Sequence, residues 1–195
     1  RLDRTLEELN RRLDSPPGAF TRQAGLDEFA GVLRPGNLSG ALVHLWEHLH
    51  PVNVRFVVVQ GELDVVPEVQ GAPSTRNASG FDGPAFHAAA ELLEELRGSR
   101  ESRSVFIRLG GRERDDVLLS DLGDLLYAKV LDWTDRQMEV HRVYRTTGSQ
   151  EATAEELRVS QSTVSRVLAA ADHRRVVGAI SRFSRCLDEA SKEAV

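Results

Sequence analysis

The sequence contains very little cysteine, few aromatic residues and no long hydrophobic run. Its one cysteine, Cys186, cannot form an internal disulfide, which is typical of a protein in a reducing compartment. Cys186 falls near the apolar face of a helical pattern, so we expect a small buried side chain rather than a reactive thiol. No apolar run approaches the ~20 residues of a membrane span, and no charged-then-apolar leader precedes the first helix. These absences predict a cytoplasmic protein with no membrane partner.

An excess of positive charge is also absent. The chain has 25 Lys and Arg against 30 Asp and Glu, a formal net charge of -5. Sequence-independent adhesion to nucleic acid comes from many cations that neutralise phosphates, so this balance argues against it. Any DNA binding must come from a local patch. With 195 residues, 41% hydrophobic and 28% charged, the chain has the composition of one large or two small globular domains.

The first part of the chain, residues 1–112, mixes helical and strand patterns. Spacings of three and four between leucines indicate helices, and β-branched or aromatic runs indicate strands. The expected order is helix 2–13, hairpin 19–33, helix 38–49, strand 53–63, helix 84–96 and strand 104–109. With one strand added in front, which is missing from the chain, this order gives an α+β ferredoxin-like sandwich. We expect an antiparallel sheet covered on one face by helices.

The polar stretch "GGRERDD" at 110–116 is the best candidate for a domain boundary. From there the sequence predicts about five helices and no strand, so residues 113–195 form a second, all-α domain. Its last helix carries an apolar pattern that either pairs two chains into a homodimer or covers the domain's own core: Val176, Val177, Ile180, Phe183 and Leu187.

The segment "AEELRVSQSTVSRVL", residues 154–168, has the pattern of a helix-turn-helix. Ala154 is the small residue of the first helix, Leu157 and Val159 flank the turn, and Val164 and Val167 point inward from the second helix. Ser160 is a natural N-cap for that helix. The turn has Arg158 where glycine is usual, so it must form without the residue that best tolerates positive φ.

The outward residues of the second helix are of the types that contact bases and phosphates. Residues 158–185 contain six arginines and one acid, Asp172, a local charge of +5. The sequence therefore predicts sequence-specific binding of double-stranded DNA, usually by a dimer. An ordinary helical pair packed on its neighbours would have the same pattern. The DNA contacts that we expect are Arg158, Ser160, Gln161, Ser162, Thr163, Ser165, Arg166, Arg174 and Arg175.

Several stretches together resemble the SatD family of bacterial proteins. They are "GLDEFAGVL" (25–33), "RFVVVQGEL" (55–63), "FDGPAFHAAAELLEEL" (81–96) and "WTDRQMEVHRVY", followed by the helix-turn-helix. The resemblance covers nearly the whole chain, and Asp82-Gly83-Pro84-Ala85-Phe86 is its most specific element. It implies an architecture more than a reaction. Together with the helix-turn-helix, it predicts a bacterial transcriptional regulator.

The layout of the N-terminal part is also similar to the palm-like domain of nucleotide cyclases, including those with a Gly-Gly-Asp-Glu-Phe hairpin. That resemblance implies Asp27 and Glu28 as possible ligands of a nucleotide or of Mg²⁺, with Asp82 a further candidate. Leu26 replaces the second glycine and the first strand's carboxylate is missing, so we expect no catalytic residues and no resident cofactor. The alternative is a nucleotide-processing enzyme, or a nucleotide sensor, that uses Mg²⁺. Asp82 is also explained as a cap of the helix that begins at Pro84.

A zinc-peptidase motif occurs at residues 44–48, where His44-Leu45-Trp46-Glu47-His48 fits the pattern H-x-x-E-H. On a helical wheel at ~100° per residue, both histidines point away from the stripe of Leu42, Leu45 and Leu49. We therefore expect them to be solvated helix residues and not metal ligands.

Overall fold

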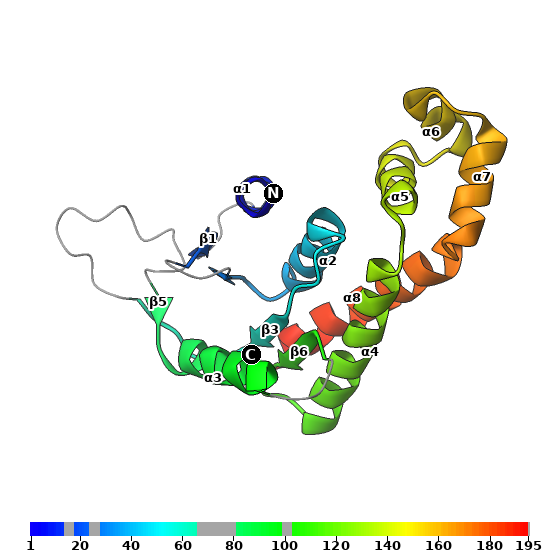
Figure 1. Ribbon diagram of the computed structural model, residues 1–195. Helices are drawn as coiled ribbons and strands as arrows, with labels where there is room; N and C mark the ends of the chain where they lie inside the picture. The colour runs from blue at the N-terminus through cyan, green and yellow to red at the C-terminus, as the bar shows by residue number, and fades with distance from the viewer. Residues whose placement is uncertain (14–17, 24–27, 66–80, 99–102, 195) are drawn as a thin grey trace.

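The computed structural model describes residues 1–13, 18–23, 28–65, 81–98 and 103–194, and this part of the chain is mixed α+β and mostly helical (Figure 1). The first part contains α1 (Leu2–Arg12), β1 (Gly18–Arg22), β2 (Phe29–Val32), α2 (Leu38–Leu49), β3 (Phe56–Val59), β4 (Asp64–Val65), β5 (Phe81–Asp82), α3 (Pro84–Gly98) and β6 (Val105–Arg108). Five helices follow: α4 (Glu113–Leu131), α5 (Asp135–Thr147), α6 (Gln150–Leu157), α7 (Gln161–Ala170) and α8 (His173–Glu193). The predicted order of helices and strands is thus confirmed, with the short β4 and β5 added.

The strands that the structure describes form three separate pairs and not one antiparallel sheet. β1 and β2 form the predicted hairpin, and β4 pairs with β5. β3 and β6 are parallel, with Phe56 opposite Val105. A parallel pair needs a crossover connection, and α3 lies in the segment that joins these two strands. The expected antiparallel arrangement is therefore wrong for β3 and β6.

Side chains of α4 occupy the outer edge of β6. Ser120 Oγ accepts a hydrogen bond from the backbone amide of Ile107 at 2.9 Å. Asp124 Oδ1 accepts bonds from the amides of Ser104 at 2.6 Å and Val105 at 3.1 Å. An unpaired strand edge is a template for further pairing, and here helix side chains satisfy its amides. This explains why β6 has β3 as its only strand partner among the described residues.

The main core centres on Trp46 of α2, whose side chain is 1% exposed. Its ring lies 5.4 Å from that of Tyr127 in α4 and stacks at 5.9 Å on Phe183 in α8. α4 approaches closely at Gly123, where a Cβ would come within 3.1 Å of Val105 and 3.2 Å of Phe183. Helices α4 and α8 therefore belong to the same packed body as α2, β3 and β6.

A second, smaller core lies between α5, α6 and α7. It consists of Val140, Ala154, Val164 and Leu168. The small core is separate from the main core, and α4 and α8 contribute to the main core although the sequence assigned both helices to the second domain, residues 113–195. The polar stretch at 110–116 contains the short turn after β6 and the first four residues of α4. In Figure 1 the three helices of the small core lie together at one end of the molecule, away from α3.

The apolar face of α8 covers the protein's own core. Val176, Phe183 and Leu187 are buried in the main cluster, and Val177 and Ile180 pack against it. Of the two alternatives for this face, the structure favours core packing over pairing with a second chain. Cys186 directly precedes Leu187, about 100° away around the helix. It is exposed, so the expectation of a buried cysteine was wrong. None of the helices in the described ranges is long and apolar enough to cross a bilayer.

Candidate nucleic-acid interface

Helices α6 and α7 form a tight helical pair, and each of the two helices begins at a serine N-cap. Ser149 caps α6, and its Oγ accepts from the amide of Ala152 at 3.4 Å. Ser160 caps α7, and its Oγ accepts from the amide of Thr163 at 3.2 Å, as the sequence predicts. α5 has its own capping box, in which Thr134 and Gln137 each bind the other's backbone amide.

The turn between α6 and α7 forms without glycine. Arg158 adopts the left-handed conformation, with φ 54° and ψ 46°. Its amide and that of Val159 both bond back to carbonyl groups in the last turn of α6. Left-handed geometry is costly for a residue with a Cβ, and here helix-ending hydrogen bonds offset that cost. The exposed Arg158 side chain is left at the surface of the turn.

The burial of α7 separates an inner from an outer face. Val164 is fully buried and Leu168 is 7% exposed, while Val167 is only half-buried. Gln161, Ser162 and Arg166 are exposed. The predicted outer residues therefore lie on one surface, with Leu168 rather than Val167 as the second inward anchor. Thr163 and Ser165 are half-buried at the edge of that surface.

The N-termini of α6 and α7 lie side by side. Gln161 Nε2 donates to Gln150 Oε1 at 2.6 Å, which joins the first residues of the two helices. The bond therefore links side chains that project from the first turns of the two helices. The bond also restrains the Gln161 carboxamide. The sequence reasoning missed Gln150, although its place directly after the Ser149 cap is a usable signal.

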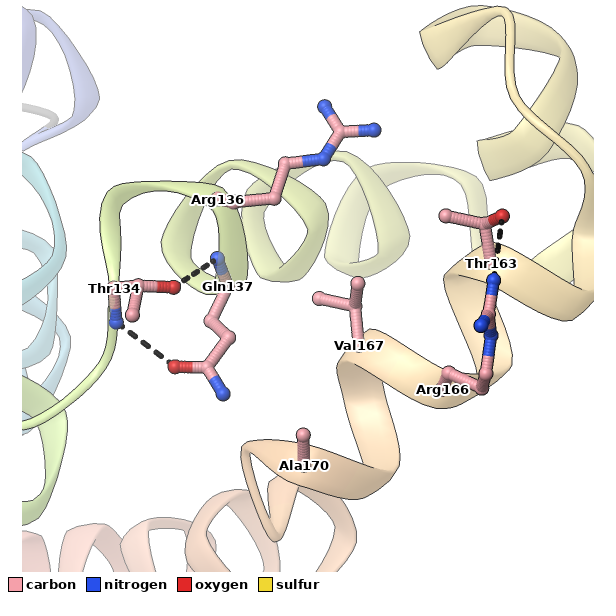
Figure 2. Close-up of a pocket in the computed structure, with 7 residues that line it drawn as sticks. All are labelled: Thr134, Arg136, Gln137, Thr163, Arg166, Val167 and Ala170. Carbon is pink, nitrogen blue, oxygen red and sulfur yellow. Dashed lines mark hydrogen bonds between the residues drawn. The ribbon is translucent and has the colours of Figure 1, made fainter.

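An open hollow of about 350 Å³ lies between the start of α5 and the outer face of α7. Figure 2 shows Arg136 projecting from α5, with Thr163 and Arg166 on α7 across the hollow. Arg136 forms an exposed ion pair with Glu139 at 2.6 Å. The hollow is lined by Thr134, Arg136, Gln137, Thr163, Arg166, Val167 and Ala170. Two guanidinium groups beside a helix N-terminus favour an anion.

Arg174 and Arg175 lie beyond the other end of α7. They are exposed in the first turn of α8, and Arg175 pairs with Asp172 at 3.1 Å. α7 has ten residues and so is about 15 Å long. The structure therefore does not bring these arginines together with the residues at the start of α7. The local positive charge predicted for 158–185 is spread along two helices.

The three helices are joined to the main body through a buried acid that the sequence reasoning did not identify. Glu47 of α2 is 5% exposed, and its Oε1 accepts from His141 Nε2 at 3.1 Å and from Arg145 Nη1 at 2.5 Å. Arg142 donates to the Glu47 carbonyl. Burial alone would raise the pKa of Glu47, but the bond from His141 and the charge of Arg145 hold it below its ordinary value.

The polar contacts continue from His141 into α8. His141 Nδ1 lies 2.9 Å from His173 Nε2, and the ring of His173 stacks on Trp133 at 6.0 Å. Burial lowers the pKa of His173 to about 4. The hydrogen-bond network is satisfied when His173 donates from Nε2 to His141, which in turn donates to Glu47. α2, α5 and α8 therefore meet in one connected polar cluster.

His44 and His48 of the H-x-x-E-H segment do not point into solvent, in contrast to what the helical wheel predicted. His44 is 2% exposed and His48 is half-buried, because α1 covers the side of α2 that the wheel left open. Burial lowers the pKa of His44 to about 4 and also lowers the pKa of His48. The Glu47 carboxylate points away from His44 and His48 and is bonded to His141 and Arg145 of α5. It therefore cannot act as the base of a peptidase site formed by the two histidines.

The acidic residues expected for a nucleotide are not brought together as free ligands. Asp27 lies outside the described residues. Glu28 forms an ion pair with Arg97 of α3. Asp82 lies in β5, where its Oδ1 accepts from the amide of Gly83 at 2.8 Å and pairs with His87 at 3.2 Å. The bonded amide precedes the first residue of α3, so Asp82 does not cap that helix in the expected way.

Comparison of this chain with protein-family models, with curated proteins and with solved structures found no match.

Proposed function

We propose that the protein binds double-stranded DNA in a sequence-specific manner and acts as a cytoplasmic transcriptional regulator of bacteria, as its resemblance to the SatD family implies. The observation that carries the proposal is the outer face of α7. Its first residues are exposed, capped by Ser160 and tied to the start of α6 through Gln150. An α-helix fits the major groove of B-DNA, and a helix-turn-helix reads bases from the N-terminal part of its second helix.

Each exposed side chain has a role in this proposal that follows from its chemistry. Gln161 and Arg166 face base edges, since glutamine pairs with adenine and arginine with guanine through two bonds. Ser162, Thr163 and Ser165 contact bases or the adjacent backbone. Ser160 is used mainly as the cap. Arg158 at the turn, Arg136 at the start of α5, and Arg174 and Arg175 on α8 neutralise phosphates.

The main body, which is formed by the N-terminal elements together with α4 and α8, serves as a sensor or dimerisation body and not as a nucleotide cyclase. Binding Mg²⁺ and a triphosphate would require free carboxylates, because hard cations take oxygen ligands. The Glu28 carboxylate is engaged by Arg97. The buried cluster around Glu47 offers a rigid connection from this body to the DNA-binding helices.

The protein acts as a dimer that pairs through α4, not through α8. Leu118, Leu122 and Leu125 are 54%, 43% and 67% exposed and lie on the face of α4 away from the core. A second copy of α4, antiparallel about Leu122, would place Leu118 near the partner's Leu125. The same register brings the exposed Asp115 opposite the partner's Lys129 at both ends. Apolar residues in the centre and opposite charges at the ends are what an isologous interface requires.

The experiment that tests DNA binding is selection from fragmented bacterial genomic DNA at two salt concentrations, followed by binding titrations on the enriched site. We expect enriched sites with two-fold symmetry and affinity that weakens with salt. Arg166→Ala should cost ~1 to 3 kcal/mol of binding free energy and relax selectivity at one base pair. Arg34→Ala, an exposed arginine before α2, is the matched control. If no site is enriched at the lower or at the higher salt concentration, the proposal is refuted.

A further inference from the structure

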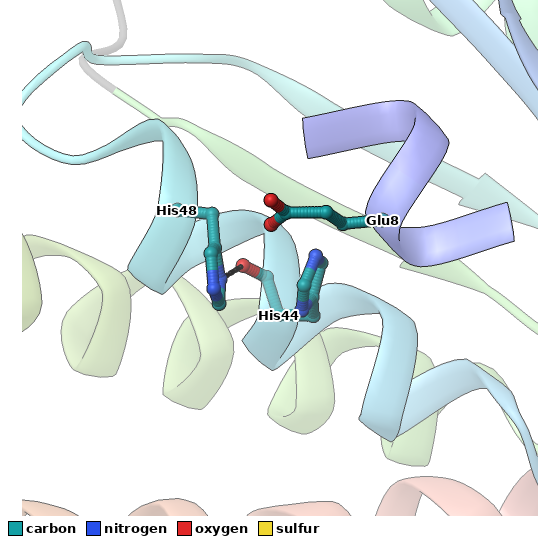
Figure 3. A group of neighbouring side chains, drawn as sticks. All are labelled: Glu8, His44 and His48. Atoms are coloured by element: carbon teal, nitrogen blue, oxygen red, sulfur yellow. Dashed lines mark hydrogen bonds between the residues drawn. The ribbon is translucent and has the colours of Figure 1, made fainter. Parts of the chain in front are cut away.

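Three potential metal ligands meet where α1 packs on α2. They are Glu8 of α1 and the histidines His44 and His48, which lie four residues apart on α2. One ligand atom from each residue lies within 4.8 Å of the others. Figure 3 shows the carboxylate of Glu8 directed toward the two imidazole rings. Spacing of four residues places both rings on one side of a helix, as a shared ion requires.

The His48 ring is oriented as in known metal sites. Its Nδ1 donates to the backbone carbonyl of His44 at 2.8 Å. A histidine that binds a metal through one nitrogen almost always donates from the other to a carbonyl or carboxylate. The bond therefore fixes the tautomer and leaves His48 Nε2 with a free lone pair.

His44 supplies an independent sign of a missing partner. The residue is 2% exposed, and its Nε2 makes no well-formed hydrogen bond among the described residues, although the Thr5 backbone lies near enough to the ring to raise its pKa slightly against the effect of burial. Buried polar atoms are nearly always satisfied, so such an atom calls for an explanation. Its ring stacks on that of His48 at 3.9 Å, which holds the two rings together.

We infer that Glu8, His44 and His48 form a binding site for a divalent transition-metal ion, with Zn²⁺ the best fit, that fastens α1 to α2. Two imidazole nitrogens and one carboxylate oxygen suit Zn²⁺, which binds both ligand types in a tetrahedron with room for a water. In tetrahedral Zn²⁺ coordination, with the usual bond lengths to nitrogen and oxygen, the ligand atoms lie about 3.4 Å from one another. The three side chains must rotate to close the observed separation, and the two stacked rings must turn so that their in-plane lone pairs converge on one ion.

Two arginines compete with the ion. Arg4 binds Glu8 Oε1 at 2.9 Å, and Arg12 Nη1 donates to His44 Nδ1 at 3.3 Å. When His44 Nε2 binds a metal, its proton must move to Nδ1, and the exposed guanidinium of Arg12 must turn away. Removal of Arg12 should therefore tighten metal binding, which no merely structural role of the histidines predicts.

The test is calorimetric titration of the chelator-treated full chain with ZnSO₄, together with absorption spectra of the Co²⁺ form. We expect one equivalent to bind, a tetrahedral Co²⁺ spectrum and a rise in Tm with metal, since only the folded state holds the site. Glu8→Gln and His48→Ala should each weaken binding at least about 10-fold. Arg12→Ala should strengthen it. His87→Ala, on an exposed histidine of α3, should change nothing.

The outcome does not depend on whether the chain binds DNA. Circular dichroism of each variant separates loss of a ligand from loss of folding. Failure of the wild-type chain to bind Zn²⁺ or Co²⁺ overturns the inference. Binding that persists unchanged in both Glu8→Gln and His48→Ala also overturns it, because the ion then lies elsewhere.

Discussion

Glu47 of α2 accepts a hydrogen bond from His141 of α5 at 3.1 Å, and the two side chains are only 7% and 5% exposed. The bond joins the main body to the three helices of the small core. Arg145 adds a second bond to the same carboxylate, at 2.5 Å. A buried carboxylate is stable only when its charge is compensated. This compensated carboxylate is therefore a central contact between the main body and helices α5, α6 and α7.

Replacing Glu47 with alanine should lower the free energy of unfolding by about 3 kcal/mol, because it leaves the buried His141 without its acceptor and removes the partner of the half-exposed Arg145. Urea denaturation followed by circular dichroism measures this loss. Glu139→Ala is the matched control, since Glu139 pairs with Arg136 at the surface of α5. An exposed pair contributes at most about 1 kcal/mol. Equal losses in the two variants would contradict the importance of the buried contact.

Acidification should destabilise the protein through His173. Its folded-state pKa is lowered to about 4 by burial, while the unfolded chain has an ordinary histidine pKa near 6.5. The unfolded state therefore binds more protons between these values. Stability is complete above pH 6.5 and falls progressively as the pH drops toward 4.

Thermal unfolding of the wild type and of His173→Gln at pH 7.5 and pH 5.5 measures this effect. His44 has a similarly lowered pKa, so both proteins should lose stability on acidification. The pKa of His48 is lowered as well, so the loss should be smaller but not absent in His173→Gln, which lacks one of these three groups. Parallel pH profiles would show that His173 does not contribute.

The local features of α6, α7 and the turn between them could be predicted from the sequence because each depends on a few neighbouring residues. The Ser160 cap is confirmed, and so is the glycine-free turn at Arg158. The hairpin of β1 and β2 is likewise a local structure that its flanking residues encode. The exposed residues of α7 followed from the inward spacing of Ala154 and Val164.

Contacts between distant parts of the chain could not be predicted in this way. Glu47 and His141 are 94 residues apart, and nothing in either segment indicates the other. The wheel of α2 assumed one buried face, but α1 packs on one side of this helix and α8 on another. His44 is buried under α1, and Glu47 is buried by its contacts with α5. The parallel pairing of β3 with β6 likewise depends on the crossover through α3.

Replacing Arg158 should change the stability of the protein and its affinity for DNA in opposite directions. Glycine tolerates φ 54° without the Cβ clash, so Arg158→Gly should raise the free energy of unfolding by about 1 kcal/mol or less. The same change removes a cation that we assign to a phosphate, so affinity for DNA should fall and the salt dependence should decrease by about one ion. Arg158→Lys, which keeps the charge, is the control. DNA affinity that is unchanged in Arg158→Gly would refute the phosphate contact.

The dimer interface proposed for α4 is tested at its centre. In the antiparallel register, Leu122 faces its own copy, so Leu122→Glu would bring two negative charges together in an apolar contact. We expect the wild type to sediment as a dimer and Leu122→Glu as a monomer. Its affinity should fall for a two-fold symmetric DNA site but stay near wild type for a single half-site. Val52→Glu, at another exposed hydrophobic residue, should leave the dimer intact. A wild-type monomer both free and on DNA would refute pairing through α4, as would a Leu122→Glu protein that remains a dimer.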